Sequence, residues 1–169
     1  MKYAVISDIH DNVWSLERVL KAIADEKAET LLVLGDLCAP FTMRDIATGF
    51  SGPVHVVFGN NDGDHLLISQ VAQKAGNVTL HGPYAELQPD GGPIAMVHYH
   101  TIGRRLAASG EFRAVFYGHS HEAEVVQRGS CVSVNPGEVM GRLGHVTFAV
   151  YDSLSGKAEL RDVPQGHWV

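Results

Sequence analysis

Short apolar runs rich in Val, Ile and Leu recur along the chain, and each ends abruptly in a polar cluster. Their apolar character is nearly continuous rather than alternating, which is typical of strands covered on both faces. They predict buried strands at Tyr3 to Ile6, Leu31 to Leu34, Val54 to Phe58, Ile94 to Val97 and Ala114 to Tyr117. We therefore expect a layered core in which sheets are flanked by helices or by another sheet.

Between the first two runs, the apolar positions change to helical spacing. Val13, Leu16, Leu20 and Ile23 follow one another at intervals of three, four and three residues. This spacing predicts an amphipathic helix with Asp11 or Asn12 as its N-cap. Further helices are expected at Met43 to Ala47, Leu66 to Ala75 and Thr101 to Ala108.

The last third of the chain has strand-like runs separated by Gly-rich turns and no long helical pattern. The runs are Glu124 to Val126, Cys131 to Val134, Val146 to Tyr151 and Ala158 to Val163, and they predict antiparallel strands. Nothing in the pattern resembles a linker or an internal repeat. We expect one α/β (α+β) domain that covers residues 1–169.

Composition narrows the function classes. The chain has 13 Lys and Arg against 19 Asp and Glu, so its formal net charge is −6. This acidic balance argues against binding to long nucleic acid or to an anionic membrane. No apolar run approaches the roughly 20 residues of a membrane span, and no signal-peptide pattern follows Met1. A cytoplasmic location is expected, with Cys38 and Cys131 as reduced, partly buried thiols.

Groups of metal-ligand type follow five of the predicted strands. They are Asp8-Ile9-His10, Gly35-Asp36, Gly59-Asn60-Asn61-Asp62, His98-Tyr99-His100 and Gly118-His119-Ser120-His121. The carboxyl ends of strands in an open α/β sheet form one crevice, so these distant segments are expected to converge. If Asp8/His10 and His119/His121 lie on extended segments, the i, i+2 spacing points both members of each pair the same way.

The chemistry of this set indicates a divalent metal centre. Imidazole, carboxylate and amide oxygen without thiolate suit Mn, Fe, Co, Ni or Zn better than Ca or Mg alone. A single His or Asp after a strand is more often a turn residue or a hydrogen-bonded residue than a metal ligand. Five such groups after five strands nevertheless favour a metal site. Five histidines without such companions are assigned to structure or surface: His55, His65, His81, His145 and His167.

Motifs of several other enzyme classes are absent from the sequence. It has no GxxxxGK[ST] phosphate loop, GxGxxG fingerprint, GxSxG elbow or HExxH helix. Nothing around Cys38 indicates a nucleophile, so a structural thiol is expected there.

The ordered set DxH, GD, GNND, a strand-terminal His and GHSH resembles the calcineurin-like metallophosphoesterases. It is most similar to their small single-domain archaeal and bacterial phosphodiesterases, over about Met1 to Gly141. The similarity includes the turn Asn135-Pro136-Gly137-Glu138. The resemblance implies a sandwich of two mixed β-sheets flanked by helices, with a dinuclear metal centre at the strand ends.

The resemblance also assigns ligands for two divalent ions per chain, with manganese as the first expectation and Fe, Ni, Co or Zn as alternatives. Asp8, His10 and His121 would bind one ion, Asn60, His98 and His119 the other, and Asp36 would bridge them. Two positions depart from the family pattern. Asn61 replaces the His of many phosphomonoesterase relatives, and Tyr99 stands where this branch often has Gly.

These expectations describe a phosphodiesterase that hydrolyses a small phosphoester by in-line attack of a hydroxide bridging two ions. Asn61 would orient the substrate by hydrogen bonding without supplying a proton. His100 is a candidate for the missing acid, although a structural role is favoured for it. The alternatives are a scaffold without turnover, as in the calcineurin-like subunit of retromer, and a metal-dependent nuclease. Homo-oligomerisation is left open, and specificity is expected from loops at 42–51, 81–92 and 101–109.

Overall fold

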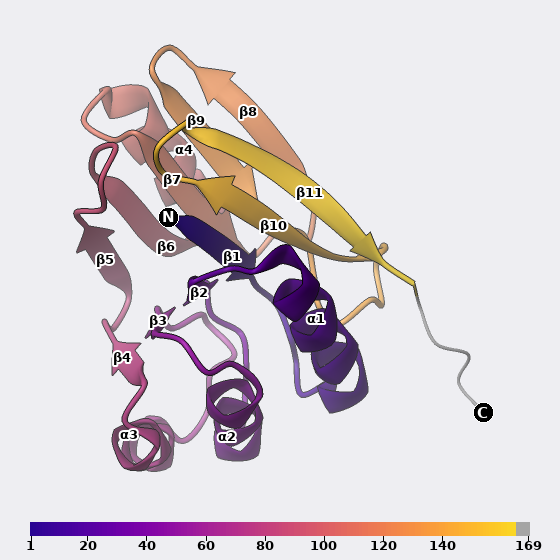
Figure 1. Cartoon of the computed structure of the whole chain (residues 1–169). Coiled ribbons are helices and arrows are strands. Elements are labelled where there is room, and N and C mark those ends of the chain that lie inside the picture. Colours follow the sequence, from indigo (N-terminus) through magenta and orange to yellow (C-terminus); the bar gives the residue numbers. More distant parts are fainter. Residues whose placement is uncertain (165–169) are drawn as a thin grey trace.

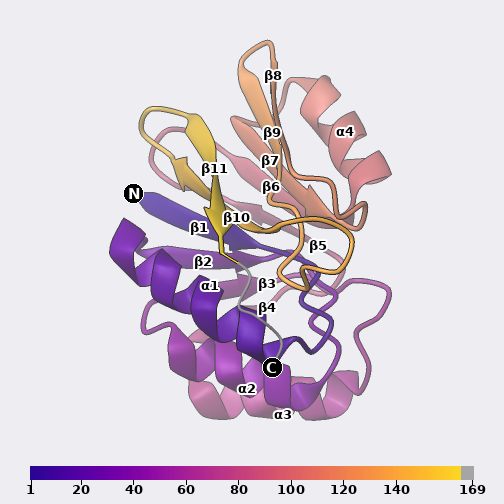
Figure 2. The same ribbon diagram turned by 90° about the vertical axis from the view of Figure 1, so that its right-hand side faces the viewer.

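Two β-sheets pack face to face, and helices cover the outer face of each sheet (Figure 1, Figure 2). The computed structural model describes residues 1–164. His167, one of the histidines predicted to be structural or on the surface, therefore lies outside the described residues. The predicted sandwich of two mixed sheets flanked by helices is confirmed. No helix among residues 1–164 is both long and apolar enough to span a bilayer.

The first sheet contains four parallel strands and an antiparallel pair. Its order is β11 (Lys157–Val163), β10 (Val146–Asp152), β1 (Lys2–Ile6), β2 (Thr30–Val33), β3 (Val54–Val56) and β4 (Val78–Leu80). β1 to β4 are parallel, whereas β10 pairs antiparallel with β1 and with β11. Three helices cover its outer face (Figure 2): α1 (Val13–Glu26), α2 (Pro40–Gly49) and α3 (His65–Ala75).

The second sheet has a parallel centre and antiparallel edges. Its order is β5 (Tyr84–Leu87), β6 (Ile94–Tyr99), β7 (Ala114–Gly118), β9 (Cys131–Asn135) and β8 (Glu124–Arg128). β7 is parallel to both β6 and β9, and β5 and β8 run antiparallel to their neighbours. Helix α4 (His100–Ser109) packs on the outer face of this sheet.

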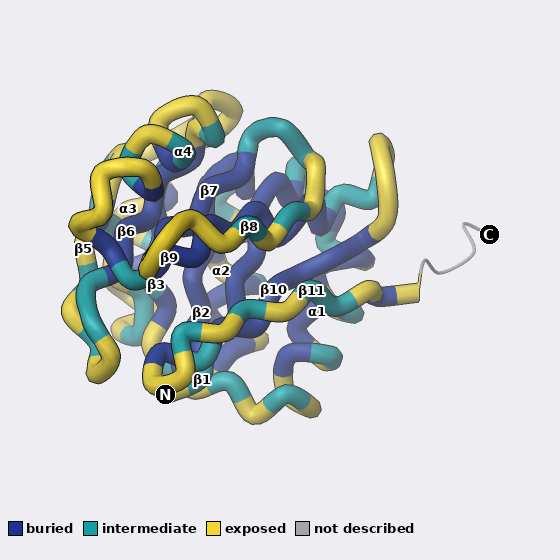
Figure 3. The backbone as a smooth tube through the Cα atoms, turned by 90° about the horizontal axis from the view of Figure 1, so that it is seen from above, coloured by how far each residue is buried: buried dark blue, intermediate teal, exposed yellow. Residues whose placement is uncertain are grey.

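Three apolar layers explain why the strand sequences are continuously apolar. In β1, Ala4 and Ile6 pack towards α1 to α3, whereas Tyr3 and Val5 pack between the two sheets. A third cluster joins the second sheet to α4 through residues such as Tyr117. Both faces of the central strands are thus buried, and exposed residues lie in the loops, on the outer sides of the helices and on the edge strands β8 and β11 (Figure 3).

Local chemistry sets the ends of the helices. The Asn12 side chain accepts a hydrogen bond from the Ser15 amide at 3.1 Å, so Asn12 is the N-cap of α1. Helix α2 begins at Pro40, before the predicted Met43, because proline is well suited to the first helical position. Helix α3 ends at Gly76, whose φ of 80° closes the last turn.

The sequence interpretation missed two strands and simplified one pairing. β4 and β5 are three and four residues long and carry polar side chains, so they lack an extended apolar run. The predicted antiparallel character of the last third holds for β8 with β9 and for β10 with β11. However, β9 also pairs parallel with β7, a contact that the short spacing between the last strands did not reveal.

Gly35 is the point at which the turns after β2 and β3 meet. It has a φ of 95°, and a Cβ built on it would lie 2.4 Å from the Gly59 nitrogen. That close approach is between two backbones, so no side-chain rotation can relieve it. Glycine at this position therefore sets how closely the two strand ends approach each other.

We expect Gly35→Ala to destabilise the protein by at least about 3 kcal/mol, because a left-handed backbone and a backbone overlap both oppose it. Gly76→Ala is the matched control, since Gly76 also has positive φ but open space around its Cβ position. Its cost should be about 1–2 kcal/mol. Urea unfolding of the two variants measures the difference, and equal losses would show that the close approach at Gly35 does not matter.

Candidate metal centre

The seven predicted ligands come together where five parallel strands of the two sheets end. Asp8 and His10 follow β1, Asp36 follows β2, and Asn60 follows β3. The second sheet supplies His98 from the end of β6, together with His119 and His121 after β7. The cluster therefore spans the junction of the two sheets.

One group of donor atoms consists of Asp8, His10 and His121, whose ligand atoms all lie within 4.8 Å of one another. Nε2 of His121 is 3.4 Å from Asp8 Oδ1, and Nε2 of His10 is 3.9 Å from the same oxygen. The two imidazoles stack with ring centroids 5.2 Å apart. Three donors thus converge from two different loops.

A second group forms around His98. Its Nε2 lies 3.1 Å from Asn60 Oδ1, 3.2 Å from His119 Nδ1 and 3.5 Å from Asp36 Oδ2. The same Asp36 oxygen is 3.5 Å from Nε2 of His10 in the first group. Asp36 therefore lies between the two groups, which is the position that the bridging role requires.

Hydrogen bonds at Nδ1 orient the two most deeply held imidazoles. His98 donates from Nδ1 to the Leu34 carbonyl at 2.7 Å, and His121 Nδ1 lies 2.6 Å from Glu138 Oε2. A proton held on Nδ1 leaves the Nε2 lone pair free to coordinate a metal. In both rings, that Nε2 faces a buried carboxylate.

The backbone of these ligands differs from the extended geometry on which the i, i+2 argument relied. Asp8, His10, Asp36, His119 and His121 all have positive φ, between 45° and 70°. Such a conformation costs non-glycine residues about 1–2 kcal/mol each. Main-chain bonds hold the first loop in place, including those from the Asp8 and His10 amides to the Gly35 and Asp36 carbonyls. Tight left-handed turns, rather than extended strands, aim these pairs.

Two buried donor atoms indicate that a cation belongs in the cluster. Asp8 Oδ1 and His10 Nε2 are buried and have no hydrogen-bond partner among the described residues. An unpaired buried polar atom costs about 1–3 kcal/mol, and more if it is charged. Both atoms point into the ligand groups, and the donor set of carboxylate, imidazole and amide oxygen suits a divalent transition ion. The residues present therefore fit the expected metal.

The two buried carboxylates have opposite pKa shifts. Burial raises the pKa of Asp8, and the neighbouring charge of Asp36 adds to that rise. Burial acts in the same direction on Asp36, but the neighbouring His98 imidazole and the hydrogen bonds from Asn61 outweigh it and lower its pKa. Asp36 is therefore held as a carboxylate, and Asp8 is the group that needs a further positive charge nearby.

Asn61 and His100 lie at the edge of the cluster. The Asn61 backbone amide and its Nδ2 donate to the two oxygens of Asp36, both at 2.8 Å, although the residue itself is exposed. His100 stacks on His119 with ring centroids 5.6 Å apart, and its Nδ1 is buried with no hydrogen-bond partner in the described part of the chain. Tyr99, the departure from the family pattern, packs its ring against His119 at 4.8 Å.

Two carboxylates that hold the site were not assigned a role from the sequence. Asp62 accepts bonds from the amides of Asp36, Gly59 and Cys38 and thereby ties the turns after β2 and β3 together. Glu138 is fully buried and accepts from the Leu143 and Gly144 amides in addition to contacting His121. Both residues lie in motifs that the sequence showed, GNND and NPGE, so their position was visible but their partners were not.

The other histidines within residues 1–164 and the Cys38 thiol lie outside the two ligand groups. His55 and His81 bond to each other at 2.9 Å, His65 stacks on Phe58, and His145 is exposed. Burial, followed by the nearby charges of Asp11 and Asp62, raises the pKa of Cys38 to about 12. Its sulfur, 3.7 Å from His10 Nδ1, is therefore a thiol near neutral pH.

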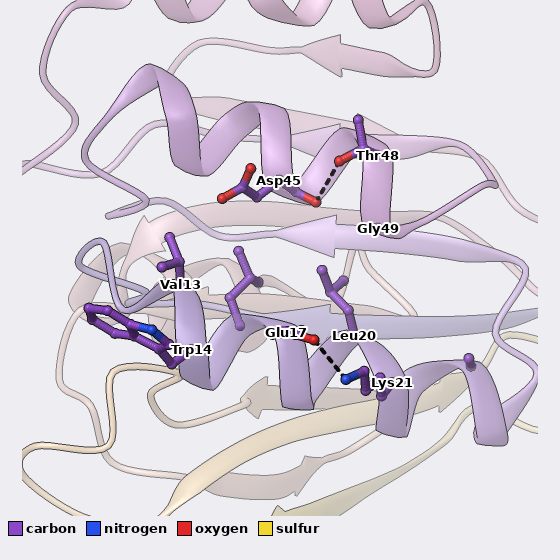
Figure 4. Close-up of a pocket in the computed structure, with 10 residues that line it drawn as sticks. Val13, Trp14, Glu17, Leu20, Lys21, Asp45, Thr48 and Gly49 are labelled. Atoms are coloured by element: carbon purple, nitrogen blue, oxygen red, sulfur yellow. Dashed lines mark hydrogen bonds and ion pairs between the residues drawn. The ribbon is translucent and has the colours of Figure 1, made fainter. Parts of the chain in front are cut away.

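A separate groove of about 600 Å³ lies between α1 and α2 (Figure 4). Its lining includes Trp14, Leu20 and Thr48 but none of the seven predicted ligands. The predicted metal-ligand cluster therefore lies outside this groove.

We expect Glu138→Gln to weaken manganese binding by about tenfold or more, because the carboxylate that orients His121 loses its charge. Glu122→Gln is the matched control, since Glu122 is exposed and adjoins His121 in the sequence. Titration calorimetry on metal-free protein measures both affinities. If the two variants bind manganese equally well, Glu138 does not orient the ligand.

Comparison with known proteins places this geometry in a family. A sequence profile for the calcineurin-like phosphoesterase superfamily domain matches residues 1–156. Phosphodiesterase MJ0936 of Methanocaldococcus jannaschii is 25% identical over 166 residues, which cover 96% of this chain and 98% of the relative. Phosphodiesterase YfcE of Escherichia coli is 29% identical over 147 residues, covering 82% of this chain and 79% of the relative.

Solved structures show the same fold. An archaeal phosphodiesterase superposes with a TM-score of 0.88 at 22% identity, over 96% of this chain and 100% of the other. Vps29 of Chaetomium thermophilum superposes with a TM-score of 0.69 at 15% identity, over 96% and 95%. Together with the ligand cluster and the matched profile, these similarities lead to one conclusion: the chain belongs to the calcineurin-like phosphoesterase superfamily.

Proposed function

We propose that this protein is a metal-dependent phosphodiesterase that binds two divalent ions, with manganese as the first choice. The observation that carries the proposal is a pair of buried atoms on Asp8 and His10, beside the carboxylate of Asp36, that have no hydrogen-bond partner among residues 1–164. The superfamily and the two relatives named as phosphodiesterases support the same activity. In this proposal Asp8, His10 and His121 hold one ion, Asn60, His98 and His119 hold the other, and Asp36 is shared.

The chain supplies a preorganised anionic and imidazole framework for the reaction. When bound, two such ions polarise a phosphoryl oxygen and lower the pKa of a bound water towards neutrality. The neighbouring His98 imidazole and the two hydrogen bonds that Asn61 donates lower the pKa of Asp36, so the shared position keeps its negative charge across the neutral pH range. His98 and His121 present Nε2 because their Nδ1 atoms are already engaged.

Asn61 determines which phosphoester is favoured. A carboxamide donates a hydrogen bond but has no proton to give to a leaving group, so this position cannot act as a general acid. A monoester with a poor leaving group depends most on such an acid. A diester also carries one negative charge fewer towards the acidic residues of the site. We therefore propose that diesters are the preferred substrates.

A scaffold function is the main alternative, because Vps29 structures share the fold. That likeness is at 15% identity and concerns the fold alone. The chain keeps all seven ligand-type side chains in one cluster, including two buried carboxylates that a protein without a bound metal would have to stabilise in another way. The net charge of −6 argues against a nuclease that grips long nucleic acid, so we propose a small phosphoester substrate.

Metal content tests the two-ion centre. Chelator-treated protein saturated with manganese should carry two ions per chain, and Asp36→Asn should lose at least one because both groups share that carboxylate. Elemental analysis after desalting gives the count, and Asp90→Asn, an exposed carboxylate, is the control that should retain both ions. One ion or none in the unmodified protein would overturn the dinuclear proposal.

Substrate preference tests the diesterase proposal. Methyl para-nitrophenyl phosphate and para-nitrophenyl phosphate have the same leaving group, and the manganese-loaded protein should hydrolyse the diester with the higher kcat/KM. Asn61→His should raise monoester turnover at least about tenfold, part of the roughly 10²- to 10⁴-fold that a positioned acid contributes. Asn61→Ala is the control, because it removes the amide without adding an imidazole and so shows which of the two changes alters monoester turnover. If the unmodified protein hydrolyses the monoester faster than the diester, and Asn61→His does not change monoester turnover, the role given to this position is wrong.

A further inference from the structure

A second pocket adjoins the ligand cluster on the side of His10. It has a volume of about 480 Å³ and is lined by His10 to Asn12, Trp14 and residues 140–142. His10 belongs both to this pocket and to the first group of metal ligands. A molecule seated here would therefore be continuous with one whose phosphate lies at the centre.

The walls of this pocket are fixed to the metal-ligand loop by hydrogen bonds. The Met140 amide donates to the Asp8 carbonyl at 3.0 Å, and the Met140 carbonyl accepts from Asn12 Nδ2 at 2.8 Å. The pocket and the ligand cluster are thus parts of one hydrogen-bonded unit. This connection holds the pocket in a constant position relative to the centre.

Trp14 gives the pocket an aromatic wall. It is the second residue of α1, its side chain is 63% exposed, and Figure 4 shows the indole projecting from the first turn of the helix. Other large, exposed apolar side chains lie in the first turns of the next three helices, at the second position of α2 and α3 and the third of α4: Phe41, Leu66 and Ile102. Exposed apolar surface is thus concentrated at the edge where the ligand loops lie, which is typical of a binding site.

The charges around the pocket limit what it can hold. Arg142 is the one cation in its lining, it is exposed, and no ion pair joins it to a carboxylate within residues 1–164. The Asp11 carboxylate is already engaged by the Ala39 amide and the Thr42 hydroxyl. A polyphosphate would need several cations, whereas one guanidinium and one indole suit a planar ring with few charges.

We propose that this pocket binds the ester arm of the substrate that does not leave, and that the arm is a planar aromatic group such as a nucleoside. Its ring stacks on Trp14, and Arg142 donates hydrogen bonds to its carbonyl oxygens. The inference rests on the proposed phosphodiesterase function and adds the substrate class to it. Trp14 and Arg142 are then specificity-determining residues.

Two diesters with the same leaving group test the proposal. The para-nitrophenyl ester of thymidine monophosphate carries an aromatic arm, and methyl para-nitrophenyl phosphate does not. We expect the unmodified, manganese-loaded protein to favour the thymidine ester in kcat/KM by about tenfold, mainly through a lower KM, as stacking on one indole allows. Trp14→Ala should bring the ratio of the two kcat/KM values close to one, and Trp14→Phe should retain most of the preference.

A binding measurement distinguishes failure of the pocket from failure of the proposed function. Equilibrium dialysis with the methylphosphonate ester of thymidine reports binding without turnover, and Trp14→Ala and Arg142→Gln should each weaken it severalfold. Leu154→Ala, an exposed apolar residue in the turn between β10 and β11, is the control that should leave both activity and binding unchanged.

If neither diester is hydrolysed but thymidine binding depends on Trp14, the diesterase proposal fails and the pocket stands. If both diesters are hydrolysed at similar kcat/KM, or if Trp14→Ala leaves their ratio unchanged, the aromatic-arm pocket is overturned while the diesterase proposal remains.

Discussion

The carboxylates of Asp8 and Asp36 are buried next to one another at the ends of two adjacent parallel strands. Their negative charges repel each other, and the surrounding structure compensates for this repulsion. Each is at most 1% exposed, and the charge of Asp36 raises the pKa of Asp8. Two like charges in a low-dielectric site are unfavourable unless positive groups surround them. The imidazoles of His10, His98 and His121 lie within 3.9 Å of the pair, and Asp8 Oδ1 still has no hydrogen-bond partner within residues 1–164. A cation is the remaining component that balances this arrangement.

The same requirement explains the unusual backbone of the ligand loops. Left-handed residues cost free energy, so five of them in one site persist only where other bonds hold them. Some of those bonds come from the ligand residues themselves, and others come from two carboxylates that are not among the seven predicted ligands. Asp62 fixes the turns after β2 and β3, and Glu138 fixes His121 and the following loop. Stability and site geometry are therefore supported by the same hydrogen bonds.

Much of this arrangement could be predicted from the sequence because it depends on regular rules. The apolar runs marked the central strands, and parallel strands bring residues at their carboxyl ends together, so Asp8, Asp36 and His98 were expected in one place. The ligand roles of these residues remain predictions. The left-handed turns and the partners of Glu138 depend on contacts between loops far apart in the chain, which no local pattern encodes. Strands β4 and β5 were missed for a related reason, since three or four residues become a strand only through their neighbours.

The cluster draws its side chains from both sheets, and this has a mechanical consequence. His98 of the second sheet donates a hydrogen bond to the Leu34 carbonyl, which follows β2 in the first sheet. The ligand set therefore joins the two sheets across their apolar interface. Any sliding of one sheet over the other would change the spacing between Asp36 and His98. An ion held by both sheets would resist that sliding. A substitution at Val5 or Phe116, in the core between the sheets, would therefore change the metal affinity. The packing between the two sheets therefore helps to set the spacing of the ligand atoms.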